Sequence, residues 1–244
     1  MNPAEGLLSH LIELRNRLLR ILVVFLLVFF GMFPFANELY TLLAAPMLSK
    51  LPAGGQMIAT AVTTPFFIPV KVALLAAFMV SLPHTLYQIW AFVAPGLYEQ
   101  ERRLVVPLVV SSSLLFLIGM VFCYFLVFPV VFGFITSVAP QGVAVMTDIG
   151  NYLDFVITLF MAFGVAFEVP IAVVLVVYLD MVTIQTLREI RSYVIVGAFV
   201  LGAIFTPPDV ISQFMLAMPL WLLYELGIVA AGFIRTRKVQ RLKS

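Results

Sequence analysis

The charged residues of this chain stand in small groups separated by long apolar stretches, and this spacing limits the folds open to it. The stretches 21–37, 72–98 and 104–147, for example, contain no Asp, Glu, Lys or Arg at all. A helix that crosses a membrane needs about 20 consecutive apolar residues. Of the 244 residues, 63% are hydrophobic and 11% are charged, whereas soluble domains average about 45 to 50% and about 25%. The sequence therefore predicts an all-α integral membrane protein.

The gaps between charges predict six membrane spans. The stretch 104–147 is too long for one crossing, and the turn-forming residues Ser137, Pro140 and Gly142 indicate where its helix ends. The predicted spans are 21–37, 69–94, 105–134, 152–178, 192–206 and 211–232. Before the first span we expect an amphipathic helix on the cytoplasmic surface, 1–20, and after the last span a basic cytoplasmic tail, 233–244. The expected outer segments are 38–68, 135–151 and 207–210, and the expected cytoplasmic loops are 95–104 and 179–191. Within the outer loop 38–68, the segment 39–48 predicts a short amphipathic helix.

The distribution of Lys and Arg predicts the orientation of these spans. With both termini in the cytoplasm, all of the 14 basic residues except Lys50 and Lys71 fall on the cytoplasmic side. Short basic loops are retained on that side during insertion. The first 36 residues have no clear small-residue cleavage site, so we interpret them as an uncleaved anchor. No organellar transit segment is recognisable, which makes the bacterial cytoplasmic membrane the expected location.

Prolines inside the apolar stretches predict irregular helices. They are Pro83, Pro107, Pro129, Pro170 and Pro219. A proline removes a backbone donor and tends to kink a membrane helix, and kinked helices can form a concave wall. Because proline is common in membrane helices, each position alone is weak evidence of function.

Acidic residues stand out on the basic cytoplasmic side. In the amphipathic helix Glu13 can pair with Arg17 one turn later, and Glu101 belongs to the acidic group in loop 95–104, just after the aromatic residue Phe92. One interpretation is that these carboxylates only balance neighbouring arginines. The other is that they bind a cationic partner, because a carboxylate is the geometric complement of a guanidinium group.

Glu168 is the one carboxylate near the centre of a predicted span. It is separated by similar lengths of helix from Asp154 and Asp180, which places it near the middle of the membrane. A central acid costs about 3 kcal/mol on insertion scales, so we expect it to face a polar partner or a recess. A neutral, hydrogen-bonded structural role stays open. Glu225 lies near the inner end of the last span and is expected to snorkel toward water.

The last two spans form an unusually short hairpin. The apolar arms 192–206 and 210–224 give about 22 Å of helix each, against a hydrocarbon core of about 30 Å. Local thinning of the bilayer or packing against another membrane helix would relieve this mismatch. Thr206 and Gln213 offer hydrogen-bonding groups to such a helix, although tilting of neighbouring helices needs no partner.

Several functional classes are poorly supported. A net charge of +2 with no basic domain argues against nucleic-acid binding, and one cysteine with two histidines argues against a disulfide framework or a Cys/His metal site. Cys123 is expected to be a small buried hydrophobe. No nucleophile, metal or aspartate-pair motif of an intramembrane enzyme is present, and no cofactor is expected. A proton-coupled transporter of small solutes, with Glu168 as proton site, remains the alternative, although no internal repeat supports it.

Short motifs along the whole chain resemble the TatC family, the multispanning receptor of the twin-arginine protein translocase. They include His10-Leu-Ile-Glu-Leu-Arg15, Met57-Ile-Ala-Thr60, Tyr87-Gln-Ile-Trp-Ala-Phe92, Glu101-Arg-Arg-Leu-Val-Val-Pro107, Phe167-Glu-Val-Pro170 and Thr206-Pro-Pro-Asp209. Such a set of spaced motifs is far more specific than any one of them.

The resemblance implies a glove-shaped protein of six helices with a concave face. It implies binding of the twin-arginine signal peptides of folded cargo, assembly with the single-span proteins TatA and TatB, self-association in a multimeric receptor complex, and transport driven by the proton motive force. It implies the following site residues. The signal peptide would be bound by Glu13, Glu101, Phe92, Arg15 and Arg17. The important outer-side residues would be Pro46 and Asp209, and the contact with TatA and TatB would involve Thr206 and Gln213. The carboxylate on the concave face would be Glu168.

Overall fold

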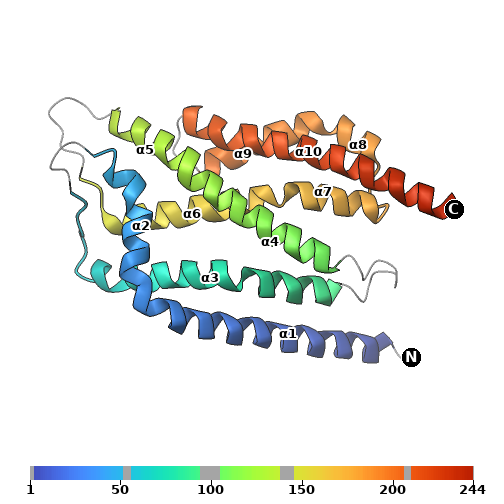
Figure 1. The fold of residues 1–244 in the computed structure, drawn as a ribbon, viewed down its shortest axis with the longest axis horizontal. Helices are drawn as coiled ribbons and strands as arrows, with labels where there is room; N and C mark the ends of the chain where they lie inside the picture. Colours follow the sequence, from blue (N-terminus) through green and yellow to red (C-terminus); the bar gives the residue numbers. More distant parts are fainter. Residues whose placement is uncertain (1–2, 52–55, 94–104, 138–145, 206–209, 244) are drawn as a thin grey trace. The chain divides into compact units, whose positions relative to one another are not determined.

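The computed structural model describes residues 3–51, 56–93, 105–137, 146–205 and 210–243 (Figure 1). Of residues 3–7, 93, 105 and 235–243 it describes the backbone alone. Every regular element in these ranges is a helix, and one isolated parallel bridge joins Ile58 to Asp148. The prediction of an all-α protein is confirmed.

The helices follow one another in chain order. Their bounds are α1 Pro3–Met32, η1 Phe33–Phe35, α2 Ala36–Leu48, α3 Thr64–Val93, α4 Val105–Phe122, η4 Cys123–Val127, α5 Phe128–Ser137, α6 Ile149–Phe167, α7 Val169–Tyr178, α8 Ile184–Glu189, α9 Arg191–Phe205 and α10 Val210–Lys243. The element η1 is a 3-10 turn and η4 is a π-helical turn.

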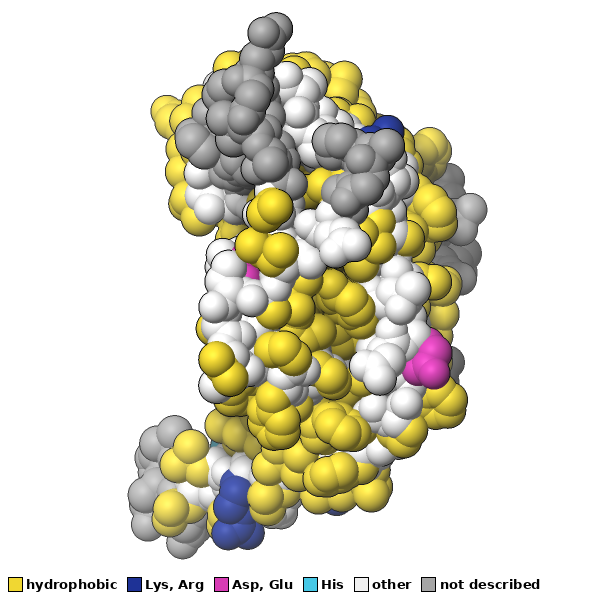
Figure 2. All heavy atoms as spheres, turned by 90° about the vertical axis from the view of Figure 1, so that its left-hand side faces the viewer, with side chains coloured by type: hydrophobic (Ala, Val, Ile, Leu, Met, Phe, Trp, Pro, Cys, Tyr) yellow, Lys and Arg dark blue, Asp and Glu magenta, His cyan; other side chains and the backbone are white. Residues whose placement is uncertain are grey.

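Five helical segments of the described chain are long and apolar enough to cross a membrane. They are Leu8–Leu48, Thr64–Phe92, Val106–Ser137, Ile149–Tyr178 and Val210–Ile234, and the shorter apolar helix α9 joins them. Large apolar side chains such as Leu27, Phe30 and Phe66 are 68%, 69% and 70% exposed. Hydrophobic side chains also predominate among the described side chains on the face in Figure 2, where charged ones are few. Exposure on this scale fits contact with lipid. The count of six spans, the cytoplasmic termini and the glove shape stay predictions.

Three helices extend beyond the segments expected from the sequence. Helix α1 continues without a break through Arg20, so the amphipathic segment and residues 21–32 of the first apolar segment form one helix. Helix α5 ends at Ser137 rather than near residue 134, and the Thr136 and Ser137 hydroxyls donate to the carbonyls of Phe132 and Phe134 in its last turns. Serine and threonine hydroxyls often bond back in this way to carbonyls three or four residues earlier in a helix. Helix α10 continues past 232 to Lys243.

The prolines affect the helices unequally. Pro170 follows the break between α6 and α7 at Glu168, and Pro129 is the second residue after the π turn η4. Pro107 lies in the first turn of α4, where a missing N–H removes no helical bond. Helices α3 and α10 continue through Pro83 and Pro219. The sequence predicted that these prolines tend to kink their helices, and α3 and α10 are not broken at the last two.

Two parts of the chain form compact units. The first consists of Met1–Ala45, Ile58–Leu114 and Asp148–Gly150, and in it α1 packs along α3. A set of hydrogen bonds around the Asp148 carboxylate also belongs to this unit. One Asp148 oxygen, Oδ2, accepts from the backbone N–H and the hydroxyl of Thr60 at 2.9 and 2.7 Å, and the other, Oδ1, accepts from the Gly150 N–H at 2.9 Å.

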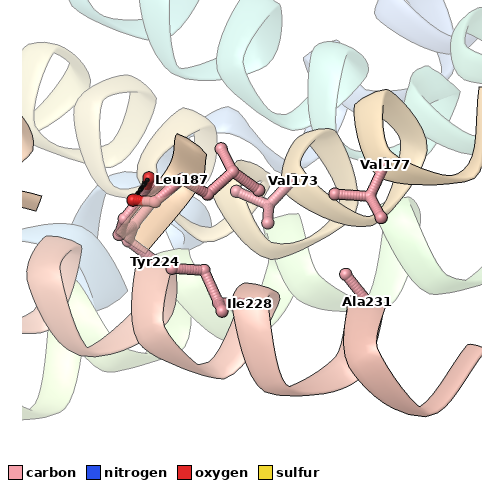
Figure 3. Close-up of a cluster of buried hydrophobic side chains, with 6 residues drawn as sticks. All are labelled: Val173, Val177, Leu187, Tyr224, Ile228 and Ala231. Carbon is pink, nitrogen blue, oxygen red and sulfur yellow. Dashed lines mark hydrogen bonds between the residues drawn. The ribbon is translucent and has the colours of Figure 1, made fainter. Parts of the chain in front are cut away.

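The second unit consists of Pro46–Met57, Leu115–Thr147 and Asn151–Ser244. In it α10 packs against α7 and α9. A buried cluster joins α7, α8 and α10 (Figure 3), and its members are Val173, Val177, Leu187, Tyr224, Ile228 and Ala231. The Tyr224 hydroxyl donates to the Leu187 carbonyl at 2.7 Å, which satisfies a polar group inside this apolar cluster. Cys123 is fully buried, as expected.

Local signals set the turn between α7 and α9. After Tyr178 the chain ends its helix with Asp180 at φ 54°, while the N–H of Met181 bonds back to the Val176 carbonyl. This is the Schellman arrangement, in which aspartate tolerates the left-handed conformation better than most residues. Thr183 then caps α8 by accepting from the Thr186 N–H at 3.1 Å. The chain thus reverses direction between α7 and α9.

An ion pair holds the start of α9 to α10. The Nη2 atom of Arg191 lies 2.6 Å from Oε2 of Glu225, and the two side chains are 42% and 25% exposed. The Arg191 Nε atom is buried without a hydrogen-bond partner in the described part of the chain. Glu225, which the sequence predicted to snorkel to water, is partly exposed and also pairs with this cation from the neighbouring helix.

Candidate functional site

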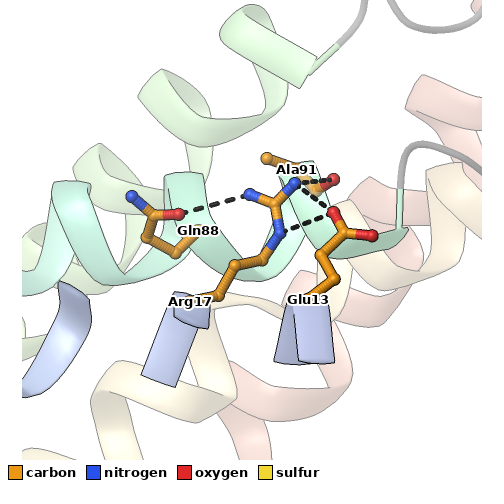
Figure 4. A network of polar contacts seen from close by, with 4 residues as sticks. All are labelled: Glu13, Arg17, Gln88 and Ala91. Carbon is orange, nitrogen blue, oxygen red and sulfur yellow. Dashed lines mark hydrogen bonds and ion pairs between the residues drawn. The ribbon is translucent and has the colours of Figure 1, made fainter. Parts of the chain in front are cut away.

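A polar network joins the N-terminal helix α1 to the C-terminal end of α3 (Figure 4). Its centre is the guanidinium group of Arg17. The Oε1 atom of Glu13 accepts from Arg17 Nε at 3.0 Å and from Nη2 at 2.6 Å. The pairing of these residues one helical turn apart, predicted from their spacing, is confirmed.

Helix α3 supplies two more acceptors to the same guanidinium. Arg17 Nη1 donates to Oε1 of Gln88 at 3.2 Å, and Nη2 donates to the Ala91 carbonyl at 3.0 Å. The Gln88 side chain is buried, and its Nε2 atom lies 3.4 Å from Nε2 of His84 one turn earlier. The side chain of Arg17 is 19% exposed and that of Glu13 is 36% exposed. Water therefore reaches the carboxylate more easily than the guanidinium.

An aromatic pair belongs to the same junction between α1 and α3. The rings of His10 and Phe92 stack, with centroids 4.3 Å apart and an interplanar angle of 19°. His10 is one turn from Glu13 on α1, and Phe92 is one turn from Gln88 on α3. The junction thus places a flat aromatic surface near a carboxylate. A guanidinium group can bind to both kinds of surface.

The structure brings together three of the five residues expected to serve a signal peptide. Glu13, Arg17 and Phe92 belong to this junction, whereas Arg15 is exposed and donates to its neighbour Asn16 at 3.3 Å. Glu101 lies outside the described residues. We call the set His10, Glu13, Arg17, Gln88, Ala91 and Phe92 the α1–α3 junction.

Sequence reasoning missed the part that α3 plays in this junction. Gln88 and His84 are polar residues one turn apart in a mainly apolar helix, and Phe92 lies one turn further. This spacing puts all three on one face of α3. A buried glutamine needs a partner, which was the available signal, but the sequence alone does not show that Arg17 provides it.

The other expected site residues lie elsewhere. Pro46 is buried within α2, and Thr206 and Asp209 lie outside the described residues. Gln213 is half-buried on α10. A Cβ built at Gly202 of α9 would lie 3.1 Å from the backbone carbonyl oxygen of Gln213. The two helices of the hairpin therefore approach closely at this point.

Glu168 occupies the break between α6 and α7. Its carbonyl accepts from the N–H groups of Ile171 and Ala172 at 3.0 Å, and its Oε1 atom is buried. Pro170, two residues later, has no N–H to continue the bonding of α6. The same proline thus explains why the helix is interrupted at this carboxylate.

The described residues contain no group of three His, Cys, Asp or Glu side chains that could hold a metal ion. The chemistry that the described part of the chain offers is recognition of a cation by a carboxylate and an aromatic surface.

Comparison with known proteins identifies the family. The family model described as "Sec-independent protein translocase protein (TatC)" matches residues 9–219. The chain belongs to the TatC family. It is 53% identical to TatC of Azotobacter chroococcum over 95% of this chain and 91% of that protein, and 53% identical to TatC of Escherichia coli K12 over 96% and 90%.

A solved structure supports the same TatC fold. The crystal structure named "Twin Arginine Translocase Receptor- TatC" is 38% identical, covers 92% of this chain and 98% of its own, and superposes with a TM-score of 0.79. This TatC protein is therefore a multi-pass membrane component of a Sec-independent protein translocase. That assignment favours translocation of proteins over transport of small solutes.

Proposed function

We propose that this TatC protein is the receptor subunit that binds twin-arginine signal peptides of folded cargo at the cytoplasmic face. Glu13 and Glu101 bind the two guanidinium groups of the peptide. Phe92 provides an aromatic surface beside them. Arg15 and Arg17 position the charged side chains around the site. The protein binds and hands over cargo and performs no catalysis.

The geometry of Glu13 is the observation that carries this proposal. Its carboxylate already binds a guanidinium group through two N–H donors, at 2.6 and 3.0 Å, and it remains 36% exposed. Charge-assisted contacts of this kind are the strongest hydrogen bonds that a surface receptor offers an arginine. The similar solved protein is named a twin arginine translocase receptor, which agrees with this role.

The rest of the function follows from the same proposal. The protein lies in the bacterial cytoplasmic membrane with both termini in the cytoplasm, and the proton motive force drives export. It assembles with TatA and TatB near Thr206 and Gln213, while Pro46 and Asp209 serve the outer side. Apolar side chains exposed along α9, such as Val196 at 63% and Ile204 at 67%, suit packing against a single-span helix in lipid. Further copies of the chain join the receptor complex.

A crosslinking experiment tests the binding role. Purified protein in detergent is mixed with a signal peptide that carries Arg-Arg and a photoreactive group, or with the Lys-Lys version. We expect Glu13→Ala and Glu101→Ala each to weaken crosslinking to the Arg-Arg peptide about tenfold, because each removes one charge-assisted contact. Membrane insertion of the variants, measured by protease accessibility, should not change.

Two results would count against this assignment. Equal crosslinking of the Arg-Arg and Lys-Lys peptides to the wild type would show that guanidinium groups are not recognised. Unchanged crosslinking in the double variant would show that the two carboxylates are structural.

A separate prediction concerns Glu168. Because its Oε1 atom is buried, Glu168→Gln keeps a hydrogen-bonding group there while Glu168→Leu does not. We expect export of a twin-arginine reporter protein to fall less in the glutamine variant than in the leucine variant, by about tenfold in relative rate. Equal export by all three proteins would make this residue dispensable.

A further inference from the structure

Arg15 lies on the side of α1 that faces away from α3. Arg17 binds Gln88 and Ala91 of α3, and it is two residues later in the chain. Residues two apart project from nearly opposite sides of a helix. The side chain of Arg15 is exposed. Its guanidinium group is therefore outside the α1–α3 junction.

Apolar side chains surround Arg15 on this side of the helix. Residues three, four and seven positions apart share one face of a helix. Five leucines stand at these spacings around Arg15, and each is at least half exposed: Leu8, Leu11, Leu18, Leu19 and Leu22. We call Arg15 and these leucines the Arg15 face. An exposed leucine surface on an apolar helix of this length fits contact with lipid acyl chains.

The guanidinium group of Arg15 has few partners inside the protein. Its Nη2 atom donates to Oδ1 of Asn16 at 3.3 Å, and no carboxylate of the described residues forms an ion pair with it. An arginine carries five N–H donors. A cation on an apolar face needs an anion or water to compensate its charge. A negatively charged ligand from outside the chain can therefore bind here.

The position of Arg15 along α1 indicates the depth of this group in a membrane. After Met32 the chain passes through η1 and turns away from the axis of α1 into α2 (Figure 1). Between Arg15 and Met32 the helix rises about 25 Å, and the hydrocarbon core is about 30 Å thick. With Met32 near one boundary of the core, Arg15 comes near the other boundary. From there a long arginine side chain reaches the phosphate layer.

We propose that Arg15 binds the phosphate group of an anionic phospholipid in the cytoplasmic leaflet, while the acyl chains of that lipid pack on the leucines of the Arg15 face. The planar guanidinium fork matches two phosphate oxygens. In a zwitterionic lipid the headgroup amine offsets the charge of the phosphate, whereas phosphatidylglycerol has no such cation. One basic residue near the membrane surface favours anionic lipid about fivefold. The inference goes beyond the proposed function and takes only the leaflet from it.

Quenching by brominated lipids tests this site. The full chain carries Leu22→Trp as reporter, with Trp90→Phe and Trp221→Phe to remove its other tryptophans. It is placed in nanodiscs of phosphatidylcholine and phosphatidylglycerol, and either lipid is brominated in the middle of its acyl chains. Comparing the two quenching curves gives the relative binding constant beside the reporter. We expect phosphatidylglycerol to be preferred about fivefold, and equal binding of both lipids after Arg15→Gln.

Two controls locate the preference. The reporter Phe30→Trp lies on the exposed side of α1, about 22 Å along the helix from Arg15, where the opposite leaflet touches it. There we expect a ratio near one with or without Arg15. Arg188→Gln removes the same charge from an exposed position on α8 and should leave the ratio at Leu22→Trp unchanged.

Four results would overturn the inference. They are equal binding of both lipids beside Leu22→Trp while Arg15 is present, a preference that survives Arg15→Gln, an equal loss in Arg188→Gln, and the same Arg15-dependent preference at Phe30→Trp. Lack of quenching by either lipid would show that protein covers the Arg15 face, and this would overturn the inference too. No signal peptide takes part in the experiment, so its failure leaves the crosslinking test of the proposed function unaffected.

Discussion

Replacing Gly119 with alanine is expected to destabilise the second unit by about 2 kcal/mol. Gly119 of α4 faces α6, and a Cβ built there would lie 2.6 Å from the Phe163 carbonyl oxygen and 3.0 Å from the Phe167 side chain. The first of these neighbours is helix backbone, so it cannot turn aside as the end of a long side chain could. The two helices must separate, and buried side chains such as Phe163 lose contacts.

Thermal unfolding in detergent measures this effect. The apparent midpoint of the Gly119→Ala variant should fall by roughly 5 °C, which is the shift that this loss gives in a chain of this size. Gly133→Ala is the control, because a Cβ at Gly133 of α5 meets no atom within 4 Å. Since alanine favours helix more than glycine does, the control should match the wild type or exceed it. Equal midpoints for both variants would mean that α4 and α6 do not pack this closely.

Gly119 also illustrates what the sequence could not provide. The absence of charge along 104–147 predicts a membrane helix there, because the hydrocarbon core admits few other structures. The requirement for a residue without a side chain comes from Phe163 and Phe167, which are far away in the chain. A pattern within one helix shows that the helix exists, but not which neighbour touches it.

The prolines show the same limit within single helices: the sequence shows where they are but not how each helix responds. All five are visible in the sequence, yet the described helices are broken at Glu168 before Pro170 and turn to π geometry before Pro129, while α3 and α10 continue through Pro83 and Pro219. A missing N–H in the interior of a helix weakens the helix by a similar amount wherever it occurs. Packing around the helix then decides whether it breaks, and a single sequence does not report packing.

The candidate site was predictable where its contacts are local. The pair of Glu13 and Arg17 follows from a spacing of four residues on a helix. The contacts of Arg17 with Gln88 and Ala91 join residues from separate helices, and no periodicity relates them. The contacts of Arg17 with α3 therefore became visible only when α1 and α3 were seen together.

The ion-pair partner of Glu225 was missed for a related physical reason. A carboxylate near the end of a span can reach water, and this was the expected behaviour. In the structure the carboxylate is 25% exposed and also forms a direct ion pair with Arg191 at 2.6 Å. The partner is the first residue of α9, which the short turn after α8 brings beside α10.

Removing one partner of this ion pair is expected to destabilise the contact between α9 and α10 strongly. In Arg191→Leu the Glu225 carboxylate, 25% exposed, loses its cation at 2.6 Å while it stays attached to an apolar helix. An uncompensated charge at a partly buried site costs about 2 kcal/mol, which is less than at a fully buried one because water still reaches it. Glu225→Leu should have a similar effect on Arg191, whose Nε atom is already buried without a partner in the described part of the chain.

A charge swap separates the ion pair from general effects of these substitutions. The double variant Arg191→Glu with Glu225→Arg restores opposite charges at the same two positions, and we expect it to recover at least half of the thermal stability lost in the single variants. Glu189→Gln is the control, since this exposed residue of α8 accepts one hydrogen bond from Gln185 at 3.1 Å, and its midpoint should stay near the wild-type value. If the swapped protein is as unstable as the sum of the single variants, the attraction between Arg191 and Glu225 does not hold α9 to α10.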